Sequence, residues 1–383
     1  MENKAFKIAV IGGKLQGTES VYLAKKAGFY SILIDKRERV AASGLCDEFI
    51  CADITKPDSY LIKVLKNADL VLPAMENDLT LDAIHKLTEK YNLNTAFDFN
   101  AYRISSSKFS SDQLFHNNNI PVPAYFPDCK SPYIVKPSVS SGSEGVKRIQ
   151  TKQEVEEFLK NVPAGEVWIA EEYLTGPSYS IEVIGKPGAY KTYQITEIHM
   201  DEVYDCNQVT CPCPNTAEQK RGFAAIAVKL AELVSLNGIM DVEVIDDEGV
   251  FKVLEIDARI PSQTPTAVYH STGVNFVSEL ARLFGGKWDY ADIVNDKLTE
   301  RYASYEHYYA ENGRIKCLGE HIMSGAGPLG LYSNYLSSDE VITDYKEGDT
   351  LFRGTFINSG KTLEELEQKR LNMLEALRHK FIK

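Results

Sequence analysis

The sequence has no long apolar run and no surplus of basic residues. None of its segments reaches the roughly 20 consecutive apolar residues of a membrane-spanning helix. Its formal net charge is −12, which argues against a nucleic-acid partner, because binding to a phosphate backbone needs a basic surface. The first residues lack an apolar stretch with a cleavage site, so we interpret them as a strand and not a signal peptide. We expect a cytoplasmic protein without a membrane or nucleic-acid partner; the acidic charge is compatible with a cationic substrate.

The cysteines are few, and their number and spacing favour neither a set of disulfides nor a metal site. The chain has 7 cysteines, an odd number, and they are scattered apart from Cys206, Cys211 and Cys213. Structural zinc takes four ligands, usually in two separated pairs, and this cluster offers no second pair although His199 lies nearby in the sequence. We therefore favour reduced structural thiols over a zinc site, as is usual in the cytosol.

The N-terminal segment has the pattern of a parallel βαβ unit. Residues 6–11 form a continuous apolar strand, followed by a glycine turn at 12–17 and a helix over 18–27. The next strand, 31–34, ends at Asp35, where a dinucleotide-binding protein carries a ribose-binding acid. However, the turn reads Gly-Gly-x-x-x-Gly and not Gly-x-Gly-x-x-Gly. We prefer a doubly wound domain whose strand-end loops bind something else.

A lysine and a loop of small residues follow a strand in the middle of the chain. The strand covers Tyr133–Lys136, the loop 138–145, and a returning strand 146–149. A Gly/Ser-rich loop lets backbone N–H groups approach phosphate oxygens closely, and the lysine supplies a point charge. This segment indicates a nucleotide triphosphate.

Three carboxylates and an arginine lie at strand spacing near residue 250. Glu255, Asp257 and Arg259 share one face of a strand, since side chains alternate with a period of two. A cross-strand ladder of salt bridges is one interpretation. Glu243 on the preceding strand of the same predicted hairpin favours the other, a Mg²⁺ site, because Mg²⁺ prefers carboxylate oxygens and bridges them to phosphates.

The remaining elements are predicted from periodicity and turn residues. We expect helices over 79–91, 105–116, 151–159, 221–236 and 362–381, with Thr151 and Glu154 as a capping box. Strands are expected over 69–72, 167–172, 179–184, 238–245 and 250–256, and residues 201–215 are expected to form a loop.

In this order, the features resemble the ATP-grasp ligases from the glycine turn to about Thr266. The markers are Lys108 opening a helix, Lys136 with its loop, the segment Glu171–Pro177, and the acid set. The resemblance implies an ATP-grasp fold of α/β and α+β character, with an N-terminal Rossmann-like (pre-ATP-grasp) parallel-sheet domain. At about 150 residues per domain the length allows two or three domains. We place this domain at 1–100, a central ATP-grasp subdomain at 101–180, and the C-terminal subdomain with the metal site at 181–383.

The resemblance also implies ATP and Mg²⁺ as cofactors, with Mn²⁺ as an alternative metal. ATP would contact Lys108, Lys136, Ser140, Ser141, Gly142, Ser143, Glu171, Glu172, Tyr173, Leu174 and Ser178. The metal would be held by Glu243, Glu255 and Asp257, and catalysis would depend on Arg259 and Lys136. Two positions depart from the family. Asp257 stands where many members carry Asn, and Ser178 stands where many carry a ribose-binding acid; Glu182 is the candidate to take that role.

The reaction implied is the joining of a carboxylate to an amine through an acyl phosphate. Segments 11–17, 73–78 and 255–265 resemble a branch that joins two amino acids, whose ammonium groups need acidic partners when buried. Candidate substrate-binding residues are Lys14, Leu15, Gln16, Glu76, Glu182, Ser262, Gln263 and Thr264, with Asp205 as a further acid; for each, a solvated loop residue is the alternative. A D-alanine–D-alanine type ligase, a purine-pathway ligase and a nucleotide-binding protein without turnover remain alternatives. Related ligases often dimerise, so we expect a homodimer.

Overall fold

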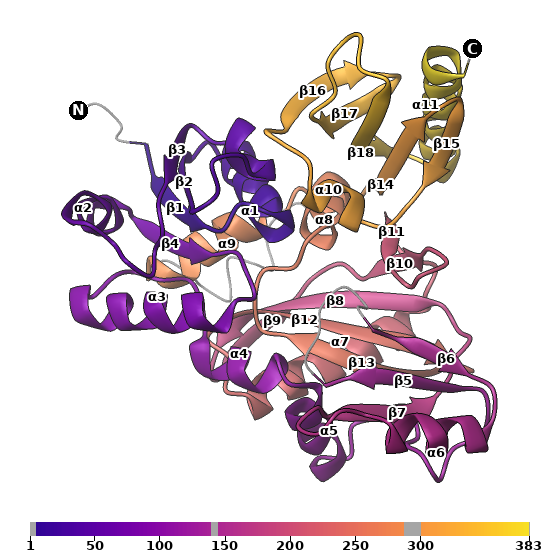
Figure 1. Ribbon diagram of the computed structural model, residues 1–383. Coiled ribbons are helices and arrows are strands. Elements are labelled where there is room, and N and C mark those ends of the chain that lie inside the picture. Colours follow the sequence, from indigo (N-terminus) through magenta and orange to yellow (C-terminus); the bar gives the residue numbers. More distant parts are fainter. Residues whose placement is uncertain (1–4, 139–144, 287–299, 383) are drawn as a thin grey trace.

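The computed structural model describes residues 5–138, 145–286 and 300–382. Three sheets organise these residues (Figure 1). A parallel sheet of four strands comes from the N-terminal part, a small antiparallel sheet of three strands from the middle, and a sheet of 11 strands from the rest. The mixture of α/β and α+β parts agrees with the fold class predicted from the sequence. Within the described ranges, no helix has both the length and the apolar character needed to cross a bilayer.

The N-terminal sheet has the strand order β3-β2-β1-β4, and all its pairings are parallel. Its strands are β1 Lys7–Ile11, β2 Tyr30–Asp35, β3 Glu48–Cys51 and β4 Leu70–Pro73, and its helices are α1 Leu15–Lys26, α2 Ser59–Asn67 and α3 Asp78–Tyr91, with a 3-10 turn η1 at Ala41–Gly44. The predicted βαβ unit is confirmed, although the first helix begins three residues earlier than expected. Gly17 is required inside α1, because a Cβ there would lie 2.0 Å from the Gly12 carbonyl oxygen.

The small sheet has the order β6-β5-β7 and is antiparallel throughout. Its strands are β5 Tyr133–Pro137, β6 Lys147–Ile149 and β7 Trp168–Glu172, accompanied by helices α4 Phe99–Ser105, α5 Lys108–Asn117 and α6 Lys152–Lys160. Thr151 and Glu154 form the predicted capping box at the start of α6. The helix expected from Ser105 is α5, which begins at Lys108 because Ser107 caps it by accepting a hydrogen bond from the Ser110 N–H; the preceding helix, α4, was not predicted.

The large sheet runs in the order β13-β12-β8-β10-β11-β14-β18-β17-β16, with β9 paired to β8 and β15 to β14. The strands are β8 Ser178–Lys186, β9 Ala189–Thr192, β10 Thr196–Met200, β11 Cys206–Cys211, β12 Gly238–Asp247, β13 Val250–Asp257, β14 Tyr302–Glu311, β15 Arg314–Cys317, β16 Gly330–Tyr335, β17 Ser338–Thr343 and β18 Leu351–Gly360. The helices are α7 Ala217–Leu233, α8 Thr264–Thr272, α9 Phe276–Phe284, α10 His321–Ser324 and α11 Leu363–Phe381.

The prediction of a loop over 201–215 was wrong in its centre. Residues 206–211 form β11, which pairs with both β10 and β14 and so lies inside the sheet. The polar residues of this strand give it little β signal, and only Val209 and Cys211 are buried. Its place is set by the two neighbouring strands, which a local pattern cannot reveal.

The N-terminal domain is packed onto the large sheet through a shared apolar core. Val21 and Leu23 of α1 belong to the same buried cluster as Val277 and Leu280 of α9 and Val268 of α8. Figure 1 shows α9 beside α1 on the side of the N-terminal sheet that faces the rest of the molecule. This packing holds the carboxyl ends of β1 and β4 over the end of β13.

Candidate active site

Four carboxylates lie side by side on the hairpin of β12 and β13. In the antiparallel register Glu243 is opposite Glu255, and Asp241 is opposite Asp257. Like charges placed directly opposite one another repel. Burial, together with the Glu255 and Asp241 charges, raises the pKa of Glu243 well above its usual value. Burial also raises the pKa of Asp257 to about 8, against the opposing charge of Arg259.

Two cations partly compensate this acidic face. Lys108, at the start of α5, has its Nζ 2.7 Å from Glu255 Oε2. Although burial acts in the other direction, the Lys108 charge and hydrogen bond leave the pKa of Glu255 below its usual value. Arg259 places its Nη2 2.9 Å from Asp257 Oδ2 and 2.5 Å from Glu76 Oε1, so it joins the end of β13 to the loop after β4.

The donor set fits Mg²⁺. Within the described residues, Lys108 and Arg259 are paired with two of the four carboxylates, and the pKa values of Asp241, Glu243 and Asp257 are all raised, which a further positive charge would relieve. Mg²⁺ in nucleotide sites is usually held by one or two carboxylates plus phosphate oxygens, so the acids need not form a closed cage. Glu243, Glu255 and Asp257, the three predicted ligands, are therefore brought together on one face.

A second cluster, Asp201, Asp205 and His321, brings its ligand atoms within 4.8 Å of one another, but both Asp201 oxygens and Asp205 Oδ2 already accept hydrogen bonds. Asp201 accepts hydrogen bonds from the backbone N–H groups of Val203, Asp205 and Gly319, and Asp205 is paired with the His321 ring. We interpret it as a hydrogen-bonded turn.

A cavity of about 450 Å³, which we call the subdomain cavity, lies between the small sheet and the large sheet. Apolar side chains line it, among them Ile134, Val146, Leu174, Ile245 and Leu254, and Lys108, Lys136, Glu243 and Glu255 also line it. An apolar slot bordered by lysines and carboxylates suits a nucleotide, with the base in the slot and the phosphates toward the lysines.

The predicted nucleotide residues of β5 and β7 lie at this cavity, with different partners. Lys136 Nζ is 2.6 Å from Glu171 Oε1, and both side chains are almost fully buried. Glu172 faces another way: its Oε1 is 2.6 Å from Lys252 Nζ and accepts the Ala124 N–H. Tyr173, Leu174 and Ser178 line the cavity as well. The predicted loop residues Ser140, Ser141, Gly142 and Ser143 lie outside the described residues.

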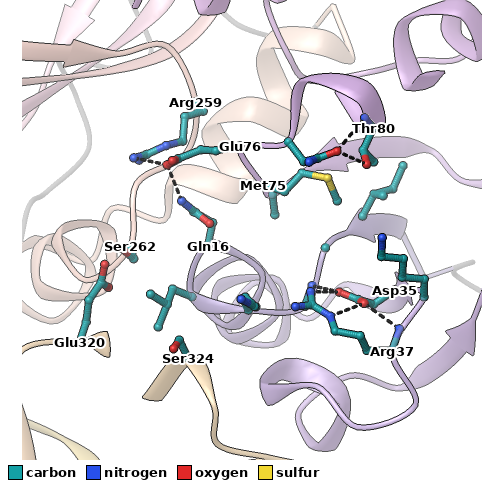
Figure 2. A pocket seen from close by; sticks show the side chains of 18 of the residues that line it. Gln16, Asp35, Arg37, Met75, Glu76, Thr80, Arg259, Ser262, Glu320 and Ser324 are labelled. Carbon is teal, nitrogen blue, oxygen red and sulfur yellow. Dashed lines mark hydrogen bonds and ion pairs between the residues drawn. The ribbon is translucent and has the colours of Figure 1, made fainter. Parts of the chain in front are cut away.

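A larger opening of about 960 Å³, which we call the crevice, is lined by the strand-end loops of the N-terminal sheet. Lys14, Leu15, Gln16 and Glu76 all line it, as predicted from their position after β1 and β4. Gln16 Nε2 donates to Glu76 Oε1 at 2.8 Å, and Figure 2 shows Glu76 between Gln16 and Arg259. Asp35 lies at the far end, bonded to Arg37 and the Gly13 N–H, and so is unavailable to a ribose.

The third opening, which we call the central cavity, has about 480 Å³ and contains the acidic face. Ser262, Gln263 and Thr264 line it, beyond the end of β13. The Thr264 N–H donates to the Ser262 carbonyl across Gln263, whose φ is +69°; this tight γ-turn holds the three polar residues against the cavity. Glu182 is placed differently from the expectation: it is fully buried in β8 opposite Asp241 and lines none of the three cavities.

Two acidic residues lie at the junction of the crevice and the central cavity. The sequence marked one of them only weakly and the other not at all. Asp205 and Glu320 line both the crevice and the central cavity. Asp205 follows β10 in the segment that was predicted to be a loop. Glu320 lies in the C-terminal part, beyond the segment that carries the family motifs. No local pattern marks Glu320, because only the folding of α10 back onto β11 brings it to the site.

The thiols of the three clustered cysteines have separate hydrogen-bond partners. The Cys211 thiol donates to the Ala267 carbonyl at 3.3 Å and the Cys213 thiol to the Ile195 carbonyl at 3.2 Å. Cys206 instead contacts Gln263 Oε1 at 3.3 Å. All 7 cysteines are free, so the interpretation as reduced structural thiols is the one the structure supports.

Comparison with known proteins agrees with this geometry. A family model described as an ATP-grasp domain matches residues 105–263. The chain is 38% identical over 375 residues to a 3-methyl-D-ornithine–L-lysine ligase of Methanosarcina acetivorans, covering 98% of both chains.

Solved structures share the fold at low identity. An L-amino acid ligase from Bacillus licheniformis has a TM-score of 0.69 and 16% identity, with 97% of both chains covered. The biotin carboxylase domain dimer of the Hydrogenobacter thermophilus 2-oxoglutarate carboxylase, in complex with MgADP, ADP and bicarbonate, also has a TM-score of 0.69 and 16% identity, over 97% of this chain and 89% of that chain. The full-length match at 38% identity shows that the chain belongs to the ATP-grasp ligases, in the family of the 3-methyl-D-ornithine–L-lysine ligases.

Proposed function

We propose that this ATP-dependent carboxylate–amine ligase activates the carboxylate of 3-methyl-D-ornithine and joins it to the ε-amine of L-lysine. The products are 3-methyl-D-ornithyl-N6-L-lysine, ADP and phosphate, which is a step of pyrrolysine biosynthesis. The substrates are those in the name of the Methanosarcina relative, which is aligned over nearly the whole chain. One observation carries the chemistry: Lys108, Glu243 and Glu255 line both the central cavity and the subdomain cavity, and Asp257 and Arg259 line the central cavity beside them.

The nucleotide is proposed to lie in the subdomain cavity. Lys136 and Lys108 would contact its phosphates, replacing their present ion pairs with Glu171 and Glu255. The backbone of Glu171–Leu174 and Ser178 would border the adenosine, as the family resemblance implies. Glu243, Glu255 and Asp257 would hold Mg²⁺, which would neutralise phosphate charge when bound. Mn²⁺ also prefers oxygen ligands, so we propose it as a substitute.

The two chemical steps follow from this arrangement. The ornithine carboxylate attacks the γ-phosphorus of ATP, ADP leaves, and an acyl phosphate forms. The lysine ε-amine then attacks the acyl carbon, and phosphate leaves as the amide forms and the amine proton is lost. Arg259 is fixed by Glu76 and Asp257, and its guanidinium stabilises the negative oxygens of the transferring phosphoryl group. The other contribution of the chain is positioning, in a cavity that limits hydrolysis of the acyl phosphate.

The substrates are proposed to occupy the crevice and the central cavity. Lys14, Leu15 and Gln16 line the crevice, while Ser262, Gln263 and Thr264 provide hydroxyl, amide and backbone groups at the central cavity. We further propose a homodimer, like the dimer of the neighbouring biotin carboxylase domain, and a cytoplasmic location, which suits 7 free thiols. Sedimentation analysis of the purified chain tests the dimer.

The proposal is tested by measuring ADP release with MgATP, D-ornithine or 3-methyl-D-ornithine, and L-lysine, together with mass spectrometry of the product. ADP release that needs both amino acids, and a product with the mass of the amide, would support it. ADP release only with D-alanine or with a purine-pathway substrate would show that the proposed substrates are wrong and that this other compound is the substrate. Tight MgATP binding without turnover would favour a non-catalytic nucleotide-binding protein.

A further inference from the structure

The acidic side chains of the crevice and the central cavity differ in whether they already have partners. Glu76 is bonded to Arg259 and Gln16, and most of the other acids are engaged as well: Asp35 by Arg37, Asp205 by His321, Asp241 by Ser180, Glu255 by Lys108 and Asp257 by Arg259. Within residues 5–138, 145–286 and 300–382, Glu320 is the one carboxylate that lines these cavities and keeps a buried oxygen, Oε2, without a hydrogen-bond partner.

Glu320 is held at the junction of the two cavities. Its backbone N–H donates to the Cys206 carbonyl of β11 at 3.0 Å, which fixes the start of α10 against the large sheet. Five residues line both the crevice and the central cavity: Glu76, Asp205, Arg259, Ser262 and Glu320. Figure 2 shows the Glu320 carboxylate beside Ser262, on the Arg259 side of the crevice and away from Asp35.

The surroundings of Glu320 are short of positive charge. The pKa of Glu320 is raised to about 7, because burial and the charge of Asp205 outweigh the hydrogen bonds from Ser262 and Gln263 and the charge of Arg259. The guanidinium of Arg259 is already bonded to Glu76 and Asp257. A cation entering the junction would therefore supply the positive charge that the Glu320 carboxylate does not receive from the chain itself.

We propose that Glu320 is a specificity residue that binds an ammonium group of one of the two amino-acid substrates at this junction. The inference rests on the proposed function, in which both substrates bring ammonium groups that do not react: two on the ornithine and the α-ammonium of lysine. A buried ammonium group needs acceptor oxygens, and the Glu320 carboxylate and the Ser262 hydroxyl provide them side by side. The nucleotide and the metal have their own ligands and do not need Glu320.

The test compares Glu320→Gln with the wild type on substrates and on analogues that each lack one ammonium group. D-norvaline lacks the side-chain amine of D-ornithine, 5-aminopentanoate lacks its α-amine, and 6-aminohexanoate lacks the α-amine of lysine. In the variant, kcat/KM for one natural substrate should fall by about 10- to 100-fold, while kcat/KM for the matching analogue stays unchanged. We call the ratio of kcat/KM for a natural substrate to kcat/KM for its analogue the discrimination. The substrate–analogue pair whose discrimination falls in the variant identifies the substrate that Glu320 binds.

Glu19→Gln is the matched control. Glu19 is 2% exposed, burial raises its pKa to about 7, and it interacts with Glu320, yet it lines none of the three cavities. This variant should keep the wild-type discrimination. The melting-temperature shift with MgADP should be the same in both variants and the wild type, and Glu320→Asp, which keeps the charge, should lose less discrimination than Glu320→Gln.

Three results would overturn the assignment: unchanged discrimination in all pairs, equal losses for a substrate and its analogue, or the same loss in Glu19→Gln. Failure of the proposed function is a separate outcome. If the wild type releases no ADP with D-ornithine and L-lysine, the function is wrong; if it does and Glu320→Gln discriminates normally, only the role of Glu320 is wrong.

Discussion

Replacing Asp257 by Asn is expected to stabilise the protein in the absence of metal, increasingly so as the pH rises, and to weaken its response to MgADP. Asp257 stands opposite Asp241 on the hairpin and close to Glu255. Burial raises its pKa from 3.8 to about 8 despite the charge of Arg259. Asn keeps an oxygen that can ligate a metal but carries no charge.

The sign of the effect follows from proton binding. Between pH 3.8 and about 8 the folded protein keeps the Asp257 proton while the unfolded chain has lost it, so rising pH favours unfolding through this window. The ceiling is about 1.4 kcal/mol per pH unit. With the side chain 22% exposed we take roughly half of that. From pH 5 to pH 8 the advantage of the variant should then grow by ~2 kcal/mol, or ~2–4 °C in melting temperature for a chain of this size.

The assay is thermal unfolding of Asp257→Asn and wild type between pH 5 and pH 8, with EDTA and then with saturating MgADP. The exposed Asp128, changed to Asn, is the control and should show no such trend. With MgADP the variant should gain less in melting temperature than the wild type, because an amide oxygen binds the metal more weakly than a carboxylate. An advantage that does not change with pH, or an undiminished MgADP shift, would refute the reasoning.

Three further changes test other parts of the site. Lys136→Ala should abolish turnover. Because it leaves the buried Glu171 unpaired, it should also lower the free energy of unfolding by about 3 kcal/mol in urea titrations. The double variant Lys136→Ala/Glu171→Ala should recover the stability but not the turnover. Arg259→Lys keeps the charge but loses the planar fork, so kcat should fall by about 100-fold or more with an unchanged MgADP shift, and near-normal kcat would exclude the role given to Arg259. Gly176→Ala would place a Cβ 1.7 Å from the Asp246 carbonyl oxygen and should lower the melting temperature by circular dichroism; an unchanged value would contradict the packing there.

Local patterns predicted the parts of the site that lie within single elements. The period of two placed Glu255 and Asp257 on one strand face, and the turn at 246–249 predicted the hairpin that joins the strand of Glu243 to the strand of Glu255, without its register. The predicted capping box at Thr151 formed as well. These features depend on residues a few positions apart, whose geometry follows from the backbone alone.

The rest depends on contacts between distant segments. The register that puts Asp241 opposite Asp257, the burial of Glu182, and the arrival of Glu320 at the cavities are set by strand pairing and by the docking of the C-terminal part. The ion pairs of Lys108 and Lys136 were likewise beyond a local pattern, because each partner lies on another element. The boundaries near 100 and 180 and the individual ligand roles stay predictions.

The most direct test of the central claim is the fate of oxygen from the substrate carboxylate. With D-ornithine or 3-methyl-D-ornithine labelled with ¹⁸O in its carboxylate, MgATP and L-lysine, an acyl phosphate route transfers one labelled oxygen to inorganic phosphate, and the other stays in the amide. Mass spectrometry of the phosphate should therefore show one ¹⁸O per amide formed. Label in AMP, or unlabelled phosphate beside a labelled amide, would contradict the account.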